Sequence, residues 1–243
     1  MPLLIIAFIL SGAAGLIYES IWSRYLGLFV GHSAYAQIIV LVIFLGGMSL
    51  GAWLAGERST QFQYPLRVYA IVELLAGILG VAFHWLFSGT TGVAYEHLFP
   101  ALAGGAGLTA AKWAIAGLLI LPQSILLGTT FPLMTAGALR LAPAAPGRTL
   151  SLMYFANSLG AAVGVLLAGF FLIEWAGLQG TLETAAALNF IVAAVVYGGS
   201  RAFGWEDGAS DARRPERAAD AGDGVTAHAH GDAHGTGAPD QVI

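Results

Sequence analysis

The sequence has 243 residues, of which 57% are hydrophobic and only 10% are charged, and its mean hydropathy is +0.75. Soluble domains carry about 25% charged residues, so this composition excludes an ordinary soluble enzyme, a disordered chain and a nucleic-acid-binding protein. The absence of cysteine excludes disulfides, thiol redox centres and zinc–thiolate sites. We therefore expect an integral membrane protein whose main partner is the lipid bilayer.

Six segments are apolar and long enough to cross a bilayer as helices, which takes roughly 20 residues each. They lie at about 3–28, 34–56, 66–88, 109–139, 150–173 and 179–199. The fourth is too long for a simple crossing and contains Pro122 and Pro132, which remove backbone donors, so we expect one kinked helix or, alternatively, two short ones. The expected fold class is all-α, with a polytopic domain of six transmembrane helices over residues 1–200.

Basic residues alternate by side along the chain. Arginines flank the second and fourth connections and follow the sixth span, whereas the first, third and fifth connections contain no Lys or Arg. Because Lys and Arg concentrate in cytoplasmic loops, this pattern predicts that both termini lie in the cytoplasm. The dominance of Arg over Lys, with abundant Ala and Gly, indicates a bacterial protein and therefore a multi-pass protein of the cytoplasmic (inner) membrane.

Residues 201–243 form a polar tail with four Arg and eight Asp or Glu, so the whole net charge of −4 lies in it. Segments with so few apolar residues cannot bury enough surface to fold, and we expect a disordered cytoplasmic tail. His228, His230 and His234 lie close together there, but no rigid scaffold fixes their geometry, so we expect no dedicated metal site. No P-loop, nucleophile elbow or HExxH motif is present, and we expect no cofactor.

Small residues form stripes on several predicted spans, a pattern typical of close helix packing in membranes. The candidate packing residues are Gly47, Gly51, Gly77, Gly80, Gly160 and Gly164. Because six helices are half of a twelve-helix transporter, we expect a homodimer or a partner membrane protein. The Gly47/Gly51 and Gly160/Gly164 faces are candidate surfaces for that contact.

A short repeat links the two halves of the membrane region. Ser-Leu-Gly-Ala occurs at 49–52, near the end of the second span, and again at 158–161, near the start of the fifth. Transporters are often built from three-helix repeats, and the repeated tetrapeptide is a weak indication of such a plan.

Acidic residues within the predicted spans are the main functional signal. A charge at mid-bilayer costs about 3 kcal/mol on insertion scales, so a buried acid needs a partner, a water-filled cavity or a proton. Glu73 lies deep in the third span, whereas Glu19 and Glu183 lie nearer the ends of theirs, where side chains reach the interface more easily. An acid inside a membrane span is by default a functional-site candidate.

Aromatic residues accompany these acids on the predicted helix faces. The candidate solute-binding residues are Glu19, Glu73, Glu183, Tyr18, Trp22, Tyr69 and His84. Carboxylates pair with ammonium groups and aromatic faces attract cations, which favours a small cationic solute. His84 has a second interpretation, as a satisfied polar group near the periplasmic interface.

Five motifs, in order along the chain, resemble the membrane-bound spermidine synthase-like proteins, also called fused MFS/spermidine synthases. They are SGAAGLIYESIWSR at 11–24, GGMSLG at 46–51, PLRVYAIVEL at 65–74, LPQSILLGTTFP at 121–132 and YFANSLGA at 154–161. The likeness covers about residues 7–198. In that family, as the resemblance implies, a multi-helix membrane region precedes a cytoplasmic aminopropyltransferase-like domain with a Rossmann-type methyltransferase fold.

That catalytic domain would bind decarboxylated S-adenosylmethionine and a polyamine, but none of its catalytic residues has a counterpart here, so we expect no enzymatic activity from this chain. Two functions follow from the resemblance. The first is transport or membrane-side handling of a small cationic solute such as a polyamine. The second is a non-transporting anchor or scaffold for a separately encoded, soluble synthase-like domain or another complex. A membrane enzyme acting at the Glu73 and His84 stripe is a weaker third interpretation.

Overall fold

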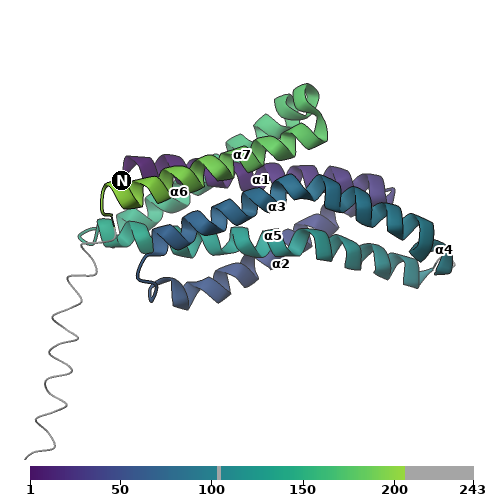
Figure 1. Ribbon diagram of the computed structural model, residues 1–243, viewed down its shortest axis with the longest axis horizontal. Helices are drawn as coiled ribbons and strands as arrows, with labels where there is room; N and C mark the ends of the chain where they lie inside the picture. Colours follow the sequence, from purple (N-terminus) through teal and green to yellow (C-terminus); the bar gives the residue numbers. More distant parts are fainter. Residues whose placement is uncertain (103–104, 206–243) are drawn as a thin grey trace, which may run out of the picture. The chain divides into compact units, whose positions relative to one another are not determined.

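The computed structural model describes residues 1–102 and 105–205, which form a bundle of long helices (Figure 1). The elements are α1 (Pro2–Val30), α2 (Ser33–Ser59), α3 (Pro65–Val93), η1 (Ala94–Leu98), α4 (Phe99–Ala101), α5 (Ala106–Leu141), α6 (Pro146–Leu167), η2 (Ala168–Leu172) and α7 (Ile173–Ala202). The segments η1 and η2 are short π-helices. The predicted tail, with His228, His230 and His234, lies outside the described residues from 206 onwards.

Within residues 1–102 and 105–205, five helical segments are long and apolar enough to span a membrane. The last of them runs over 57 residues, from Pro146 to Ala202. It is interrupted at Gly177, whose φ of 70° and ψ of −174° are not helical. Glycine adopts a positive φ without the penalty that a Cβ imposes. On either side of this break, α6 and α7 both pack against α1, and the chain turns back at Gly177 (Figure 1).

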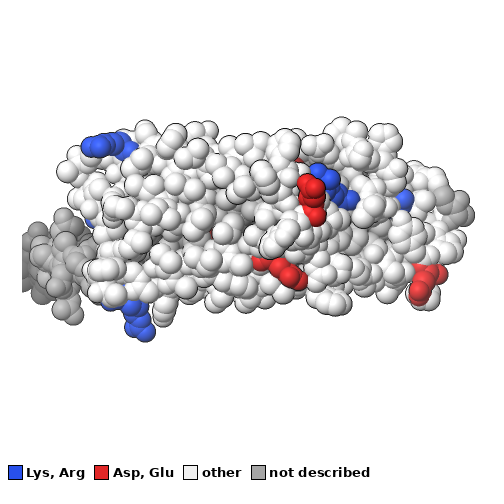
Figure 2. Space-filling view, turned by 90° about the horizontal axis from the view of Figure 1, so that it is seen from above, with Lys and Arg blue, Asp and Glu red and all other residues white. Residues whose placement is uncertain are grey.

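The outer surface of the helices is apolar, as required of helices that contact lipid. Trp53, Leu118 and Phe170 are examples of large hydrophobic side chains that are exposed on this surface. In Figure 2 uncharged residues cover most of the visible face, and its acidic side chains gather in the right-hand half. This combination of helix length, hydropathy and apolar exterior is that of an integral membrane protein.

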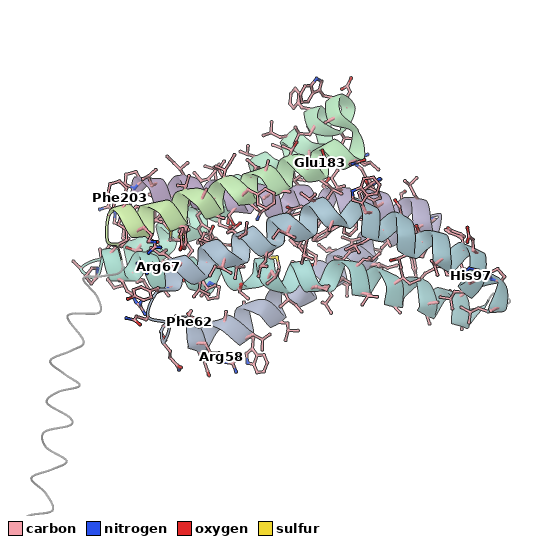
Figure 3. All side chains as sticks on the ribbon, viewed as in Figure 1. Arg58, Phe62, Arg67, His97, Glu183 and Phe203 are labelled. Carbon is pink, nitrogen blue, oxygen red and sulfur yellow. The ribbon has the colours of Figure 1, made fainter. Side chains whose placement is uncertain are left out.

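Both ends of the described chain lie at the same end of the bundle. Met1 and Trp205 pack against the same apolar cluster. Figure 3 shows Phe203, Arg58 and Arg67 at this end, whereas His97 lies at the opposite one. We call these two ends the arginine end and the distal end.

Arg140, in the last turn of α5, joins this helix to the connection between α2 and α3. Its guanidinium donates hydrogen bonds to the backbone oxygens of Thr60 at 3.0 Å, Phe62 at 2.6 Å and Gln63 at 2.9 Å. Charge-assisted hydrogen bonds of this kind are stronger than neutral ones. The connection is therefore held against the end of α5 rather than left loose.

The long fourth predicted span is one helix. α5 continues through Pro122 and Pro132 for 36 residues, which at 1.5 Å per residue is about 54 Å. Hydroxyls near the prolines bond to the preceding turn, for example Thr135 Oγ1 to the Phe131 carbonyl oxygen at 2.8 Å. In membranes such side chains help to satisfy backbone groups around a proline. The alternative of two short helices is wrong, whereas a kink at the prolines stays a prediction.

The predicted glycine faces pack within the chain. Gly51 of α2 lies directly against the backbone of Ile125 in α5, and Gly47 lies against Ser124. Gly160 of α6 lies against the carbonyl of Ile9 in α1. A Cβ at any of these glycines would collide with the neighbouring helix, so each allows a close approach of two backbones.

These contacts correct one expectation. The Gly47/Gly51 face is covered by α5, and the face that carries Gly160 and Gly164 is covered by α1. Neither face is free to meet a second copy of the chain or a partner membrane protein. Close packing of small residues was expected, but the partner helix belongs to the same molecule.

The two close helix pairs follow one pattern. In the α2–α5 pair, Gly51 meets the Ile125 carbonyl and Gly128 meets the Met48 carbonyl. In the α1–α6 pair, Gly160 meets the Ile9 carbonyl and Gly12 meets the Asn157 carbonyl. Ser-Leu-Gly-Ala occupies 49–52 in the first pair and 158–161 in the second, so the repeated tetrapeptide makes the same contact twice.

This correspondence relates the helices before residue 102 to those after residue 105. α2 and α6 carry the repeated tetrapeptide, and α5 and α1 are the helices on which they pack. Two further contacts follow the same correspondence, because α3 packs on α5 as α7 packs on α1, and α3 packs on α7. The α1–α2 contact does not follow it, since it is more extensive than the corresponding α5–α6 contact. The fold therefore has two similar three-helix halves, α1 to α3 and α5 to α7. In each half the second helix packs closely on the first helix of the other half.

Candidate functional site

A chain of hydrogen-bonded polar side chains lies where α1, α3 and α7 meet. Ser11 Oγ of α1 donates to Glu73 Oε1 of α3 at 2.5 Å, and Asn189 Nδ2 of α7 donates to Glu73 Oε2 at 2.6 Å. Tyr18 Oη of α1 donates to Asn189 Oδ1 at 3.0 Å. Glu73, Asn189 and Tyr18 are all 0% exposed. The Glu73 carboxyl is thus enclosed by protein, with a hydrogen-bond partner for each oxygen.

The helix periodicity explains why these residues meet. Ser11 and Tyr18 lie seven residues apart on α1, which is two turns of one face. Asn189 belongs to a buried stripe of α7 that includes Ala185, Val192 and Val196. Glycine makes room for the contact, because Gly80 of α3 lies against the Tyr18 hydroxyl and a larger residue there would displace it.

Two further buried groups border this cluster. The Tyr69 hydroxyl, one turn from Glu73 on α3, has no hydrogen-bond partner within the described residues, and Ser11 and Glu73 are its polar neighbours. Gln123 of α5 donates from Nε2 to the Ala76 carbonyl of α3 at 2.9 Å and lies near Tyr18. We call Ser11, Tyr18, Tyr69, Glu73, Gln123 and Asn189 the central polar cluster.

The carboxyl of the central polar cluster is paired with neutral side chains. Ser11 and Asn189, the hydrogen-bond partners of Glu73 in the described part of the chain, are both neutral. A hydroxyl can donate to a carboxylate or accept from a carboxylic acid, so the short contact to Ser11 fits both protonation states of Glu73. The Tyr69 hydroxyl is a further group that can donate to the same carboxyl. These partners therefore fit Glu73 both as a carboxylic acid and as a carboxylate.

The predicted binding residues do not form one site. Glu73, Tyr18 and Tyr69 come together in the central polar cluster. His84 and Glu183 lie further toward the distal end, where His84 Nδ1 is 2.7 Å from Tyr25 Oη. Glu183 is exposed and accepts a hydrogen bond from Gln179 Nε2 at 2.9 Å (Figure 3). Glu183 therefore does not share a buried site with Glu73.

Trp22 and Glu19 occupy different places. Trp22 stacks on Tyr18 with ring centroids 5.7 Å apart and also meets Phe44 and Phe83 at 6.1 Å and 5.9 Å, so it belongs to an aromatic layer on the distal side of the cluster. Glu19 is 9% exposed. No hydrogen bond in the described part of the chain joins the Glu19 carboxyl to Glu73.

Sequence reasoning missed Ser11, Gln123 and Asn189. Each is a polar residue within a segment that is otherwise apolar, and this is the sequence signal that could have identified them. The structure buries all three. Small polar side chains within spans are ambiguous, because many bond only to their own helix, as Ser124 does to the Ile120 carbonyl at 2.9 Å. Their role depends on what the neighbouring helix presents.

A double-mutant cycle tests the link between Glu73 and Asn189. Glu73→Leu and Asn189→Leu each leave a buried polar group unpaired, which costs roughly 1–3 kcal/mol in the free energy of unfolding. We expect the double variant to lose less than the sum, with a coupling of about 1 kcal/mol. The measurement is reversible unfolding in mixed detergent micelles. A control cycle of Glu73→Leu with the exposed Ser158→Leu should be additive, and additivity in both cycles would contradict the contact.

Comparisons of the chain with family models, with curated proteins and with solved structures find no match.

Proposed function

We propose that the chain is a membrane module that transports or handles a small cationic solute and that Glu73 binds the positive charge of that solute. The observation that carries this proposal is a fully buried carboxyl, inside apolar helices, whose hydrogen-bond partners among residues 1–102 and 105–205 are the neutral side chains of Ser11 and Asn189. An ionised carboxylate in such surroundings is costly unless a cation compensates it. A group that alternates between a proton and a bound cation avoids this cost in both states.

The exchange can be written with its charges balanced. As a carboxylic acid, Glu73 donates a hydrogen bond to the Ser11 hydroxyl oxygen, while Asn189 donates a hydrogen bond to the other carboxyl oxygen. When an ammonium group enters, the proton leaves to solvent, Ser11 turns to donate, and the carboxylate pairs with the ammonium group. Tyr69 supplies a further hydroxyl beside the bound cation. Glu73 and the ammonium group that it binds are together neutral, as Glu73 and its proton are, which suits a low-dielectric interior.

The membrane arrangement that we propose has six crossings, with both termini in the cytoplasm and the bacterial cytoplasmic membrane as the location. The reversal at Gly177 supports counting α6 with η2 and α7 as separate crossings. The shared position of Met1 and Trp205 supports an even number of crossings. Arg58, Arg67 and Arg140 at the same end agree with the enrichment of positive residues on the cytoplasmic side.

The composition of the central polar cluster favours transport over a purely structural role. The central polar cluster draws side chains from both three-helix halves, with Ser11, Tyr18, Tyr69 and Glu73 from the first and Asn189 from the second. Solute sites of transporters built from repeats lie at the interface between the repeats. The resemblance to spermidine synthase-like proteins favours a polyamine as the solute.

Uptake by reconstituted protein tests the proposal. Purified protein in proteoliposomes should take up radiolabelled spermidine with saturation, and unlabelled putrescine should compete while a neutral diol of similar length should not. Uptake equal to that of protein-free liposomes would overturn transport as the function. If uptake were absent and a soluble synthase-like protein co-purified in stoichiometric amount, the anchor or scaffold function would replace transport.

A further inference from the structure

The strongest feature outside the central polar cluster is a second group of polar side chains nearer the distal end. Tyr25 of α1 and His84 of α3 form a hydrogen-bonded pair of 2.7 Å, and Tyr25 is 6% exposed. Phe190 of α7 packs directly against Gly77 of α3. Glu183 and His84 each lie seven residues, or two turns, from this contact on the distal side, so they fall at the same depth of the α3–α7 pair. The helices α1, α3 and α7, which also contribute to the central polar cluster, therefore contribute to this group as well.

The chemistry of this second group suits an ammonium ion. Glu183 supplies a carboxylate. Arg24, which precedes Tyr25 on α1, makes no ion pair with this carboxylate in the described part of the chain. The Tyr25 ring offers an aromatic face, and Phe83 and Phe87 pack around it with centroids at 5.6 Å and 4.9 Å. A carboxylate beside aromatic faces attracts organic cations and repels anions.

An aromatic layer separates this group from the central polar cluster. Trp22 is 0% exposed and touches Tyr18 on one side and Phe83 on the other. Tyr18 belongs to the central polar cluster, and Phe83 packs against Tyr25. Tyr18 and Tyr25 are seven residues apart on α1, or about 10 Å along the helix axis. A cation at Glu183 thus lies one aromatic layer away from Glu73.

We propose that Glu183, Tyr25 and His84 form an outer cation-binding station, which receives the ammonium group of an organic amine before it passes the Trp22 layer to Glu73. This inference deepens the function proposed above and rests on it for the direction of movement, but binding at the outer station does not depend on Glu73. The station gives a role to His84 and Glu183, two predicted binding residues that lie apart from Glu73.

Binding stoichiometry tests the outer station directly. In calorimetric titration of purified protein with spermidine, we expect two binding events for the wild type, one for Glu183→Gln and one for Glu73→Gln. Glu174→Gln is the matched control, because Glu174 is also an exposed acid at the distal end of the chain's last hairpin, and it should keep both events. A single event in the wild type, or two in Glu183→Gln, would overturn the proposal.

Uptake kinetics separate this inference from the proposed function. Glu183→Gln should raise the KM for spermidine about tenfold, equivalent to about 1.4 kcal/mol of binding, and leave the maximal rate nearly unchanged. Tyr25→Phe, which keeps the ring and its packing, should raise KM by a smaller factor. A KM equal to that of Glu174→Gln would overturn the outer station while leaving Glu73 in place. Loss of one binding event in Glu183→Gln without any uptake by the wild type would instead support the station and refute transport.

Discussion

Glu73→Gln should abolish saturable spermidine uptake and leave the folded protein intact. Glutamine has the shape of the carboxyl and fits its partners, because its oxygen can accept from Asn189 and its amide can donate to the Ser11 hydroxyl oxygen. The variant therefore loses the charge without losing the hydrogen bonds. Removing one partner of a buried ion pair costs about 3 kcal/mol or more, which corresponds to at least about a hundredfold loss of binding. The measurement is initial uptake into proteoliposomes over a range of spermidine concentrations.

Glu57→Gln is the control for this loss. Glu57 is an exposed acid near the end of α2 at the arginine end, so its substitution removes one negative charge without touching the central polar cluster. We expect wild-type uptake from it. Equal melting temperatures of the two variants would show that folding does not explain any difference. Wild-type uptake by Glu73→Gln would refute Glu73 as the cation site.

Gly51→Leu should prevent stable packing of α2 on α5. The backbone of Ile125 lies where the new side chain would begin, and backbone cannot move aside as a flexible side chain can. Overpacking in a close-packed interior costs about 1–3 kcal/mol even when side chains yield, so we expect a loss at or above the top of this range. Heating in detergent followed by size-exclusion chromatography measures the resulting fall in melting temperature.

Gly46→Leu is the matched control, because Gly46 lies on the same helix and nothing stands within 4 Å of its missing Cβ. It should melt close to the wild type. Since the α1–α6 pair repeats the α2–α5 contact, Gly160→Leu should be about as damaging as Gly51→Leu. A Gly51→Leu protein as stable as Gly46→Leu would contradict the observed contact of the two helices.

The helices were largely predictable, because a membrane span must be long and apolar wherever it lies in the fold. The predicted segment 109–139 lies inside α5, and 66–88 lies inside α3. The course of α5 through Pro122 was not predictable in the same way, since a proline can end a helix or be accommodated, and neighbouring helices and hydroxyls decide which. The break at Gly177 falls within the short interval between the predicted segments 150–173 and 179–199.

The site was only half predictable for a geometric reason. Glu73 and His84 share a helix face by their spacing, but they are eleven residues apart, or about 16 Å along the axis. Sequence periodicity gives the face and not which residues of other helices lie at the same depth. Asn189 and Ser11 reach Glu73 from helices far away in the chain, and Glu183 does not reach it. In the same way the glycine stripes indicated close packing without naming the partner helix.

Infrared difference spectroscopy on the purified protein tests most directly whether Glu73 exchanges a proton for a cation. On adding spermidine, the carbonyl stretch of a protonated carboxyl should disappear and a carboxylate band should grow, with release of a proton to the buffer. Neither change should occur in Glu73→Gln, while Glu183→Gln should retain both. A wild-type spectrum with no loss of the protonated band on spermidine binding would contradict the exchange, as would the same loss in Glu73→Gln.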